Sequence, residues 1–178
     1  MNTKSKRNIY LTGLMGCGKS TVGSEVAQRM SREFIDLDVL ITKNSGYSIG
    51  EIFFKFGEQR FREWETKTLS QVSIQTKVVV ATGGGIVTRK INCDLLTATG
   101  IKIYLKAPPE LLLERLASDN SRPLLRGLTS KKRLEKLQMS LVQREENYCS
   151  NAIIVDACGS VSEVTTRILA SIREYLLS

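Results

Sequence analysis

The most apolar stretches of this chain are short runs of β-branched and aromatic residues, which is the pattern of buried strands. Residues 77–81 read Lys-Val-Val-Val-Ala, an uninterrupted apolar run typical of a parallel strand that is covered on both faces. Shorter runs of the same kind predict further strands at residues 9–12, 34–35, 101–105 and 152–155. The candidate strands are therefore spread over nearly the whole chain.

Between these runs the apolar residues recur every three or four positions, which predicts amphipathic helices. In one such segment Phe61, Leu69 and Val72 share a face, while Arg62 and Glu65 lie three apart on a neighbouring face, within reach of each other. The predicted helices cover residues 20–31, 48–56, 59–74, 108–116, a charged segment that ends near 148, and a last segment at about 161–176.

The alternation of strands and helices predicts the fold class. Strands that are separated by helices form a parallel sheet with helices on both faces. We expect a single α/β domain over residues 1–178, with three layers and a central five-stranded parallel sheet. Residues 118–129 interrupt the pattern, because they are polar and contain Pro123 and Gly127, and they predict a mobile loop.

Composition excludes several classes of protein. With 42% hydrophobic and 25% charged residues the chain is globular in composition, and no apolar run approaches the roughly 20 residues that a membrane span needs. The basic start of the chain has no signal-peptide core. There is no histidine, so no histidine triad or base is available, and the four cysteines form no CxxC pair. These features predict a cytoplasmic protein whose chemistry rests on carboxylates, lysine, arginine and backbone amides.

The net charge of +8 leaves three classes of anionic partner open: nucleic acid, a membrane surface or a small molecule. Aromatic residues make up only 6% of the chain and no basic stripe is interleaved with them, so base-stacking platforms are scarce. We therefore expect an anionic small molecule as the partner, with no nucleic acid and no membrane.

Residues 13–20, Gly-Leu-Met-Gly-Cys-Gly-Lys-Ser, match the phosphate-loop pattern GxxxxGK[ST] at every fixed position. Glycines let the backbone amides turn toward a phosphate, and the helix that begins near Ser20 directs its positive dipole end at the same anion. Lys19 supplies a charge for the β- and γ-phosphates, and the Ser20 hydroxyl suits Mg²⁺. A glycine-rich turn is the alternative, but the position between a strand and an amphipathic helix favours a nucleotide site.

Two further motifs follow predicted strands. In an extended segment residues two apart point the same way, so Asp36 and Asp38 are expected to face the cleft together, one for Mg²⁺ and one for a substrate hydroxyl. The alternative is that these carboxylates end the strand and cap the next helix. Residues 82–85 read Thr-Gly-Gly-Gly, and three successive glycines favour the close approach of a ligand to the backbone.

Taken in order, these motifs resemble those of shikimate kinases. The matching segments are the phosphate loop with Thr21, residues 36–38, residues 57–62 (Gly-Glu-Gln-Arg-Phe-Arg) with Glu65, residues 82–85, residues 122–125 (Arg-Pro-Leu-Leu), and Arg144 with Tyr148. They span about residues 8–155. The family transfers the γ-phosphoryl group of ATP to the 3-hydroxyl of shikimate, with Mg²⁺, on the route to chorismate and aromatic amino acids. The resemblance implies this reaction and a three-layer P-loop kinase fold.

The resemblance also implies a role for each matching residue. ATP would be bound by Gly16, Cys17, Gly18, Lys19, Ser20, Thr21 and Arg122, and Mg²⁺ would be held by Ser20 and, through water, by Asp36. Shikimate would contact Asp38, Arg62, Gly83, Gly84, Gly85 and Arg144, with the two arginines clamping its carboxylate and Glu65 orienting Arg62. Lys19, Asp38 and Arg122 would be catalytic, Asp38 by helping to deprotonate the attacking hydroxyl.

Larger parts of the chain also receive an expected role from the resemblance. A mobile lid at about residues 118–130 would carry Arg122 over ATP, and a helical region at about residues 38–65 would bind the substrate. Residues 156–160, which follow the last predicted strand, show no clear adenine-contacting signature. We expect a monomer.

Three other functions compete with this one. A kinase of similar fold could act on gluconate or a nucleoside monophosphate, but residues 57–62 and 82–85 argue against both substrates. A nucleic-acid-binding NTPase is disfavoured by the scarcity of aromatic residues. A catalytically inactive nucleotide sensor is disfavoured because four residues expected of an active kinase are all present: Lys19, Ser20, Asp38 and Arg122.

Overall fold

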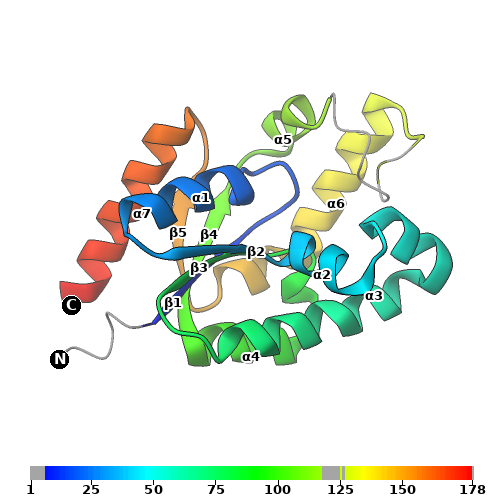
Figure 1. The fold of residues 1–178 in the computed structure, drawn as a ribbon. Helices are drawn as coiled ribbons and strands as arrows, with labels where there is room; N and C mark the ends of the chain where they lie inside the picture. Colours follow the sequence, from blue (N-terminus) through cyan, green and yellow to red (C-terminus); the bar gives the residue numbers. More distant parts are fainter. Residues whose placement is uncertain (1–6, 118–124, 126, 178) are drawn as a thin grey trace.

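Parallel pairing joins the five strands into one sheet. In the computed structural model, which describes residues 7–117, 125 and 127–177, the strands lie in the order β2-β3-β1-β4-β5 (Figure 1). Each pairing is parallel, and Ile9 lies opposite Val79 on one side and Ile101 on the other. The strands are β1 (Asn8–Thr12), β2 (Glu33–Asp36), β3 (Val78–Ala81), β4 (Gly100–Lys106) and β5 (Ala152–Asp156). The prediction of a five-stranded parallel sheet is confirmed.

Helices cover both faces of this sheet, as predicted. They are α1 (Lys19–Arg29), α2 (Leu37–Ser45), α3 (Ile49–Ser73), the 3-10 helix η2 (Ile86–Thr88), α4 (Lys90–Thr99), α5 (Pro109–Arg115), α6 (Ser130–Cys149) and α7 (Val161–Leu177). Figure 1 shows α1 and α7 on one side of the sheet and α3 and α4 on the other. Among the described helices, none combines the length and the apolar character needed to cross a membrane.

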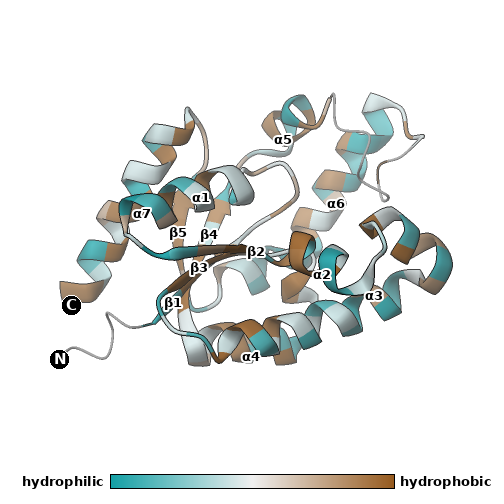
Figure 2. Ribbon diagram, in the orientation of Figure 1, coloured by the Kyte–Doolittle hydropathy of each residue, from teal (hydrophilic) through white to brown (hydrophobic). Residues whose placement is uncertain are grey.

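The middle strands are buried on both faces, which explains their unalternating sequences. Ile9 and Leu11 in β1 and Val79 and Val80 in β3 are all 0% exposed. Figure 2 shows the strands as a brown, hydrophobic layer between helices that carry teal, hydrophilic residues. Each such aliphatic side chain contributes about 1.5–3 kcal/mol when it is fully buried, so this layer provides much of the driving force for folding.

Two helices are absent from the elements predicted by apolar periodicity, although the first of them falls in the helical region at about residues 38–65 that the resemblance implied. Helix α2 begins directly after β2, because Asp36 Oδ1 accepts hydrogen bonds from the amides of Asp38 and Val39, at 3.0 and 3.3 Å. The expectation that residues 36–38 form one extended segment is therefore wrong, and Asp36 caps the next helix. Helix α4 was not predicted, and in it Asn92 and Leu96 are buried while Cys93 and Leu95 pack partly buried against the core.

The predicted break at Gly57 is confirmed. Two helical segments run into each other within α3, and Gly57 between them has φ 80° and ψ 169°. Residues with side chains rarely adopt this conformation, whereas glycine does so readily. Ser48 and Glu51 start the first segment with a reciprocal capping box.

Gly100 begins β4 beside the ring of Tyr10, and we predict that alanine destabilises the fold here. A Cβ atom at this position would overlap the Tyr10 ring and lie 2.8 Å from the carbonyl oxygen of Asn8. The backbone is extended, so lack of space alone opposes a side chain. Gly100→Ala should lower the free energy of unfolding by about 1–3 kcal/mol in urea denaturation.

The matched control for this prediction is Ser70→Ala. Ser70 lies on the exposed face of α3, and its replacement should change the free energy of unfolding by less than about 0.5 kcal/mol. Equal stabilities of Gly100→Ala and the wild type would contradict the packing argument.

Candidate active site

The loop between β1 and α1 has a backbone that only glycine adopts easily. Gly13, Gly16 and Gly18 have φ values of 137°, 83° and 94°. Gly18 is the N-cap of α1, and no side chain caps this end of the helix. Free amides at a helix start bind anions, so the loop has the backbone geometry of a phosphate site.

Lys19 is held inside this loop. It is 8% exposed, and its Nζ donates hydrogen bonds to the carbonyl oxygens of Gly13 and Leu14, at 2.8 and 2.9 Å. The Sγ of Cys17 lies 3.5 Å from the same nitrogen. The ammonium group is therefore fixed beside the free amides at the start of α1, where it adds positive charge.

Ser20, at the start of α1, and Asp36, at the end of β2, lie in contact with each other. The Ser20 hydroxyl donates to Asp36 Oδ2, while Asp36 Oδ1 is occupied in capping α2. Both are hard oxygen donors, and Mg²⁺ is commonly held by one or two such protein groups together with waters and phosphates. The described residues hold no cluster of three or more acidic, cysteine or histidine side chains for a metal, so this pair fits Mg²⁺ only with phosphate oxygens as further ligands.

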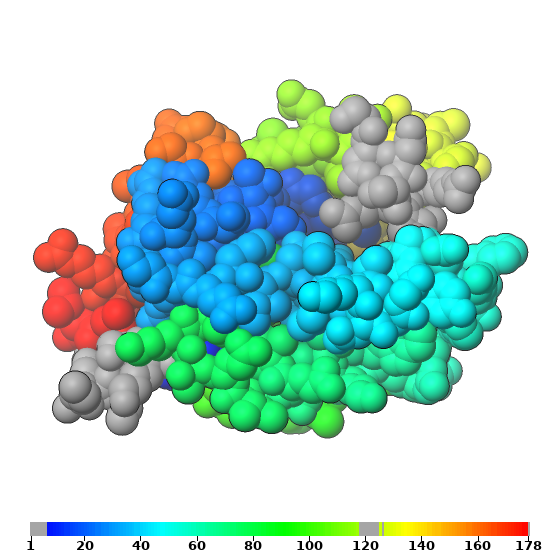
Figure 3. Space-filling view, viewed as in Figure 1, coloured from blue at the N-terminus to red at the C-terminus, as the bar shows by residue number. Residues whose placement is uncertain are grey.

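A cavity of about 470 Å³ extends from this loop along the end of the sheet. Figure 3 shows the blue amino-terminal segment between the yellow-green α5 above it and the cyan segment below it. At its far end the cavity is lined by Ala157, Gly159, Ser160 and Val161 and by Arg115, whose Nη2 donates to the carbonyl of Ala157 at 3.0 Å. The segment that showed no adenine-contacting signature thus lines the same cavity as the phosphate loop. Arg115 was missed because it reads as an ordinary helical arginine.

A second, smaller cavity of about 60 Å³ adjoins the first. Met15, Asp38 and Gly84 line both cavities, so they lie where the two meet. The second cavity is also lined by Arg62, Glu65, Gly83, Gly85, Arg144, Ile49, Phe53 and Phe61. The structure therefore brings the predicted substrate residues together around one space, next to the predicted phosphate site.

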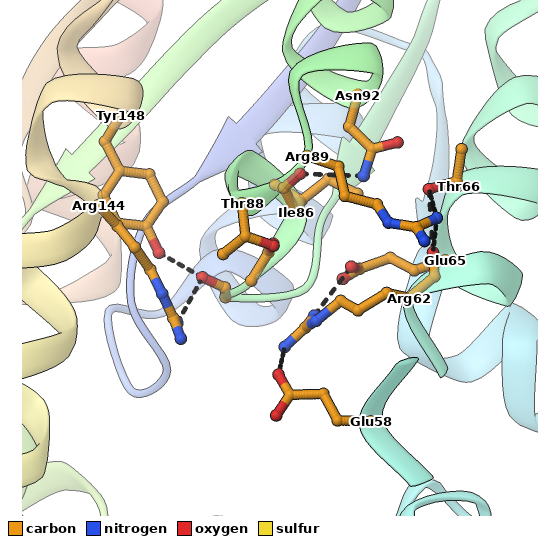
Figure 4. A network of polar contacts seen from close by, with 12 residues as sticks. Glu58, Arg62, Glu65, Thr66, Ile86, Thr88, Arg89, Asn92, Arg144 and Tyr148 are labelled. Carbon is orange, nitrogen blue, oxygen red and sulfur yellow. Dashed lines mark hydrogen bonds and ion pairs between the residues drawn. The ribbon is translucent and has the colours of Figure 1, made fainter. Parts of the chain in front are cut away.

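Arg62 and Glu65 form a buried ion pair on α3. Arg62 Nη1 lies 2.8 Å from Glu65 Oε2, and the Glu65 side chain is 0% exposed (Figure 4). Burial raises the pKa of Glu65, and the charge of Arg62 offsets this rise only in part. Burial also lowers the pKa of Arg62, but Glu65 and Glu58 raise it by more, so the guanidinium stays charged. Glu65, to which the resemblance assigns the orientation of Arg62, is paired with that guanidinium.

The three glycines after β3 make room for these side chains. A Cβ on Gly83 would overlap Glu65 Oε1, and one on Gly85 would overlap the Arg62 guanidinium. A Cβ on Gly84 would lie 3.2 Å from the Met15 amide of the phosphate loop. The glycines were expected to admit a ligand, and the groups that approach them most closely in the structure belong to the protein itself.

Arg144 reaches the same loop from α6. Its Nη1 donates to the carbonyl oxygen of Gly84 at 3.2 Å, and the Tyr148 hydroxyl donates to the same oxygen (Figure 4). The Tyr148 ring stacks on Tyr104 of β4, with centroids 4.9 Å apart. Arg144 and Arg62 thus point into one space from two different helices. Arg122, the predicted lid arginine, lies outside the described residues, as does most of the predicted lid.

Comparison with known proteins identifies the family. The family model for shikimate kinase matches residues 15–173. A shikimate kinase of Geobacter sulfurreducens is 44% identical over 170 residues, covering 95% of this chain and 92% of that protein. The chain belongs to the shikimate kinase family. Family membership makes it an ATP-dependent kinase that acts on a hydroxyl group.

Solved structures agree with this assignment. The structure of shikimate kinase from Acinetobacter baumannii in complex with shikimate superimposes with a TM-score of 0.90 at 37% identity, covering 98% of this chain and 97% of that one. A gluconokinase from Sinorhizobium meliloti reaches a TM-score of 0.66 at 16% identity, which shows a shared fold alone. Gluconate, one of the rival substrates considered from the sequence, thus belongs to a kinase of the same architecture.

The raised pKa of Glu65 predicts a specific pH dependence of stability. Because its pKa in the folded protein lies above that in the unfolded chain, about 4.3, Glu65 stabilises the fold most at low pH and loses this contribution as the pH rises through the raised pKa. The free energy of unfolding of the wild type minus that of Glu65→Gln should therefore fall as the pH rises above the ordinary glutamate pKa of about 4.3, in urea denaturation. A difference that grows with pH would mean that Arg62 outweighs burial.

Proposed function

We propose that this chain transfers the γ-phosphoryl group of ATP to the 3-hydroxyl of shikimate, giving shikimate 3-phosphate and ADP. The observation that carries the proposal is the junction of the two cavities at Asp38. One cavity contains a phosphate loop with a buried lysine, and the other contains two arginines from different helices. A nucleotide in the first and an acid in the second would meet at a carboxylate.

The phosphate side of the site supplies positive charge without covalent chemistry. Backbone amides at the start of α1, together with Lys19, would bind the β- and γ-phosphates. Ser20 and Asp36 would hold Mg²⁺, which when bound neutralises charge on those phosphates. Gly16, Cys17, Gly18 and Thr21 line the same cavity and complete the ATP contacts that we propose.

Asp38 is the proposed acceptor of the proton from the attacking hydroxyl. It lies in the first turn of α2, where Asp36 fixes the start of the helix. It lines both cavities, so a hydroxyl bound beside it can face the γ-phosphate.

The acid side of the site fixes the orientation of the substrate. Arginine forks match carboxylates in geometry and charge, so Arg62 and Arg144 would clamp the shikimate carboxylate. The backbone of Gly83, Gly84 and Gly85 would contact the ring. Arg122, on a lid that closes over ATP, would add charge at the phosphoryl group being transferred. We further propose that the protein acts as a cytoplasmic monomer.

The test of this function is ADP release in the presence of ATP and Mg²⁺. We expect turnover with shikimate and none above background with gluconate or nucleoside monophosphates. Lys19→Ala should lower kcat by about two to three orders of magnitude, because it removes a charge that the transition state needs. Turnover with gluconate alone would reject the proposed substrate, and full activity of Lys19→Ala would reject the role of the lysine.

Arg144→Ala tests the carboxylate clamp. Loss of a charge-assisted hydrogen bond should raise the KM for shikimate about 10- to 100-fold, while the KM for ATP stays within about twofold. Lys136→Ala, which removes a charge from an exposed position of the same helix, is the control and should change neither value. Equal rises of both KM values in Arg144→Ala would contradict the clamp.

A further inference from the structure

Arg62 is held by two carboxylates of very different exposure. Its Nη1 lies 2.8 Å from Glu65 Oε2, and its Nη2 lies 2.9 Å from Glu58 Oε1 (Figure 4). The Glu65 side chain is 0% exposed, whereas that of Glu58 is 51% exposed. A buried partner cannot leave without stranding a charge, but a half-exposed partner can return to water. Glu58 is therefore the displaceable partner.

The atom that Glu58 occupies is the one that a substrate carboxylate needs. A guanidinium offers two edges for a two-pronged hydrogen bond with a carboxylate, Nη1 with Nη2 and Nε with Nη2. Each edge uses a different one of the two Nη2 hydrogens, and Glu58 accepts one of them. Glu58 thus competes for Arg62 with an acid that binds to the edge Glu58 occupies.

The charges around the cavity strengthen this competition. Glu58 places a half-exposed carboxylate on the Arg62 guanidinium, and its negative charge repels an incoming anion. Arg144 forms no ion pair with any described residue, so it is the group that first attracts an acid. An acid binds to the edge of Arg62 that Glu58 occupies only when it displaces Glu58.

The local backbone permits such a displacement. Glu58 directly follows Gly57, the position at which α3 departs from helical geometry. A Cβ on Gly57 would meet nothing within 4 Å, so this turn is open to solvent. The carboxylate of Glu58 has no other described hydrogen-bond partner than Arg62, and it loses little when it moves into water.

We propose that Glu58 occupies the acid subsite on Arg62 and sets a threshold for substrate binding. This inference rests on the proposed function, because it takes Arg62 to be the carboxylate ligand. Because an acid must first displace Glu58 from this edge of Arg62, the affinity of every carboxylate that binds there is lowered by the same factor. Simple monocarboxylates, which have no ring hydroxyls to add affinity, then fall below useful affinity, while an acid that also reaches Asp38 remains bound.

The test is Glu58→Gln, which removes the charge and keeps the shape. The KM for shikimate should fall about 2- to 5-fold, as expected for the loss of a competing ion pair, and the KM for ATP should not change. The inhibition constant of benzoate, a monocarboxylate without ring hydroxyls, should fall by the same factor. Isothermal titration of both acids should give the same ratio without turnover.

Glu63→Gln is the matched control. Glu63 pairs with Arg60 three positions away on the same helix, so this change removes an equal charge without touching Arg62. It should leave the affinity of both acids within about 1.5-fold of the wild type. If Glu63→Gln increased the affinity for both acids as much as Glu58→Gln does, the effect would come from the change in overall charge, and the inference would be overturned.

Two other outcomes also decide the matter. A higher KM for shikimate in Glu58→Gln would mean that Glu58 orients Arg62 for the substrate, and an unchanged KM would mean that it does not compete; either result overturns the inference while wild-type turnover leaves the proposed function intact. Absence of shikimate turnover in the wild type would overturn both.

Discussion

The close approach of two helices to one stretch of bare backbone is the constraint on which the site depends. Gly83 leaves room for Glu65, Gly85 leaves room for the Arg62 guanidinium, and Gly84 faces the phosphate loop. A methyl group at Gly83 or Gly85 would overlap a site residue, and one at Gly84 would lie in tight contact with the Met15 amide. The buried ion pair, the phosphate loop and the anchor of Arg144 on the Gly84 carbonyl are compatible only because this loop has no side chains.

The strand order explains why the two halves of the site meet. Strand β1 lies between β3 and β4, so the loops that follow β1 and β3 leave the same edge of the sheet side by side. Ligands of open parallel sheets bind at the carboxyl ends of the strands. Asp36, at the end of β2, lies beside β3 and therefore reaches the same edge. Residues far apart in sequence thus converge without any long connection.

Much of this could be predicted from the sequence, because the relevant signals are local. Unalternating apolar runs mark buried parallel strands, and the phosphate loop has fixed spacing. Helix α2 was missed because a capping aspartate and a strand-ending aspartate look alike until the next turn is seen. The glycines were predicted to admit a ligand. The groups that lie against them, Glu65 and Arg62, are brought there by tertiary packing, which the local sequence does not reveal. Arg115 carried no signal, since its role depends on the segment after β5.

Substrate choice in this architecture must reside in side chains that the fold does not dictate. The gluconokinase from Sinorhizobium meliloti shares the fold at 16% identity, so the sheet and the phosphate loop alone do not distinguish an acid ring from another polyol. Under the proposed function the distinguishing groups come from α3 and α6, which line the second cavity beside that of the phosphate loop. Burial of Glu65 keeps Arg62 in place, and half-exposure of Glu58 leaves that arginine available. The same guanidinium is therefore rigid toward the protein and exchangeable toward a ligand, which is what selective binding of an acid requires.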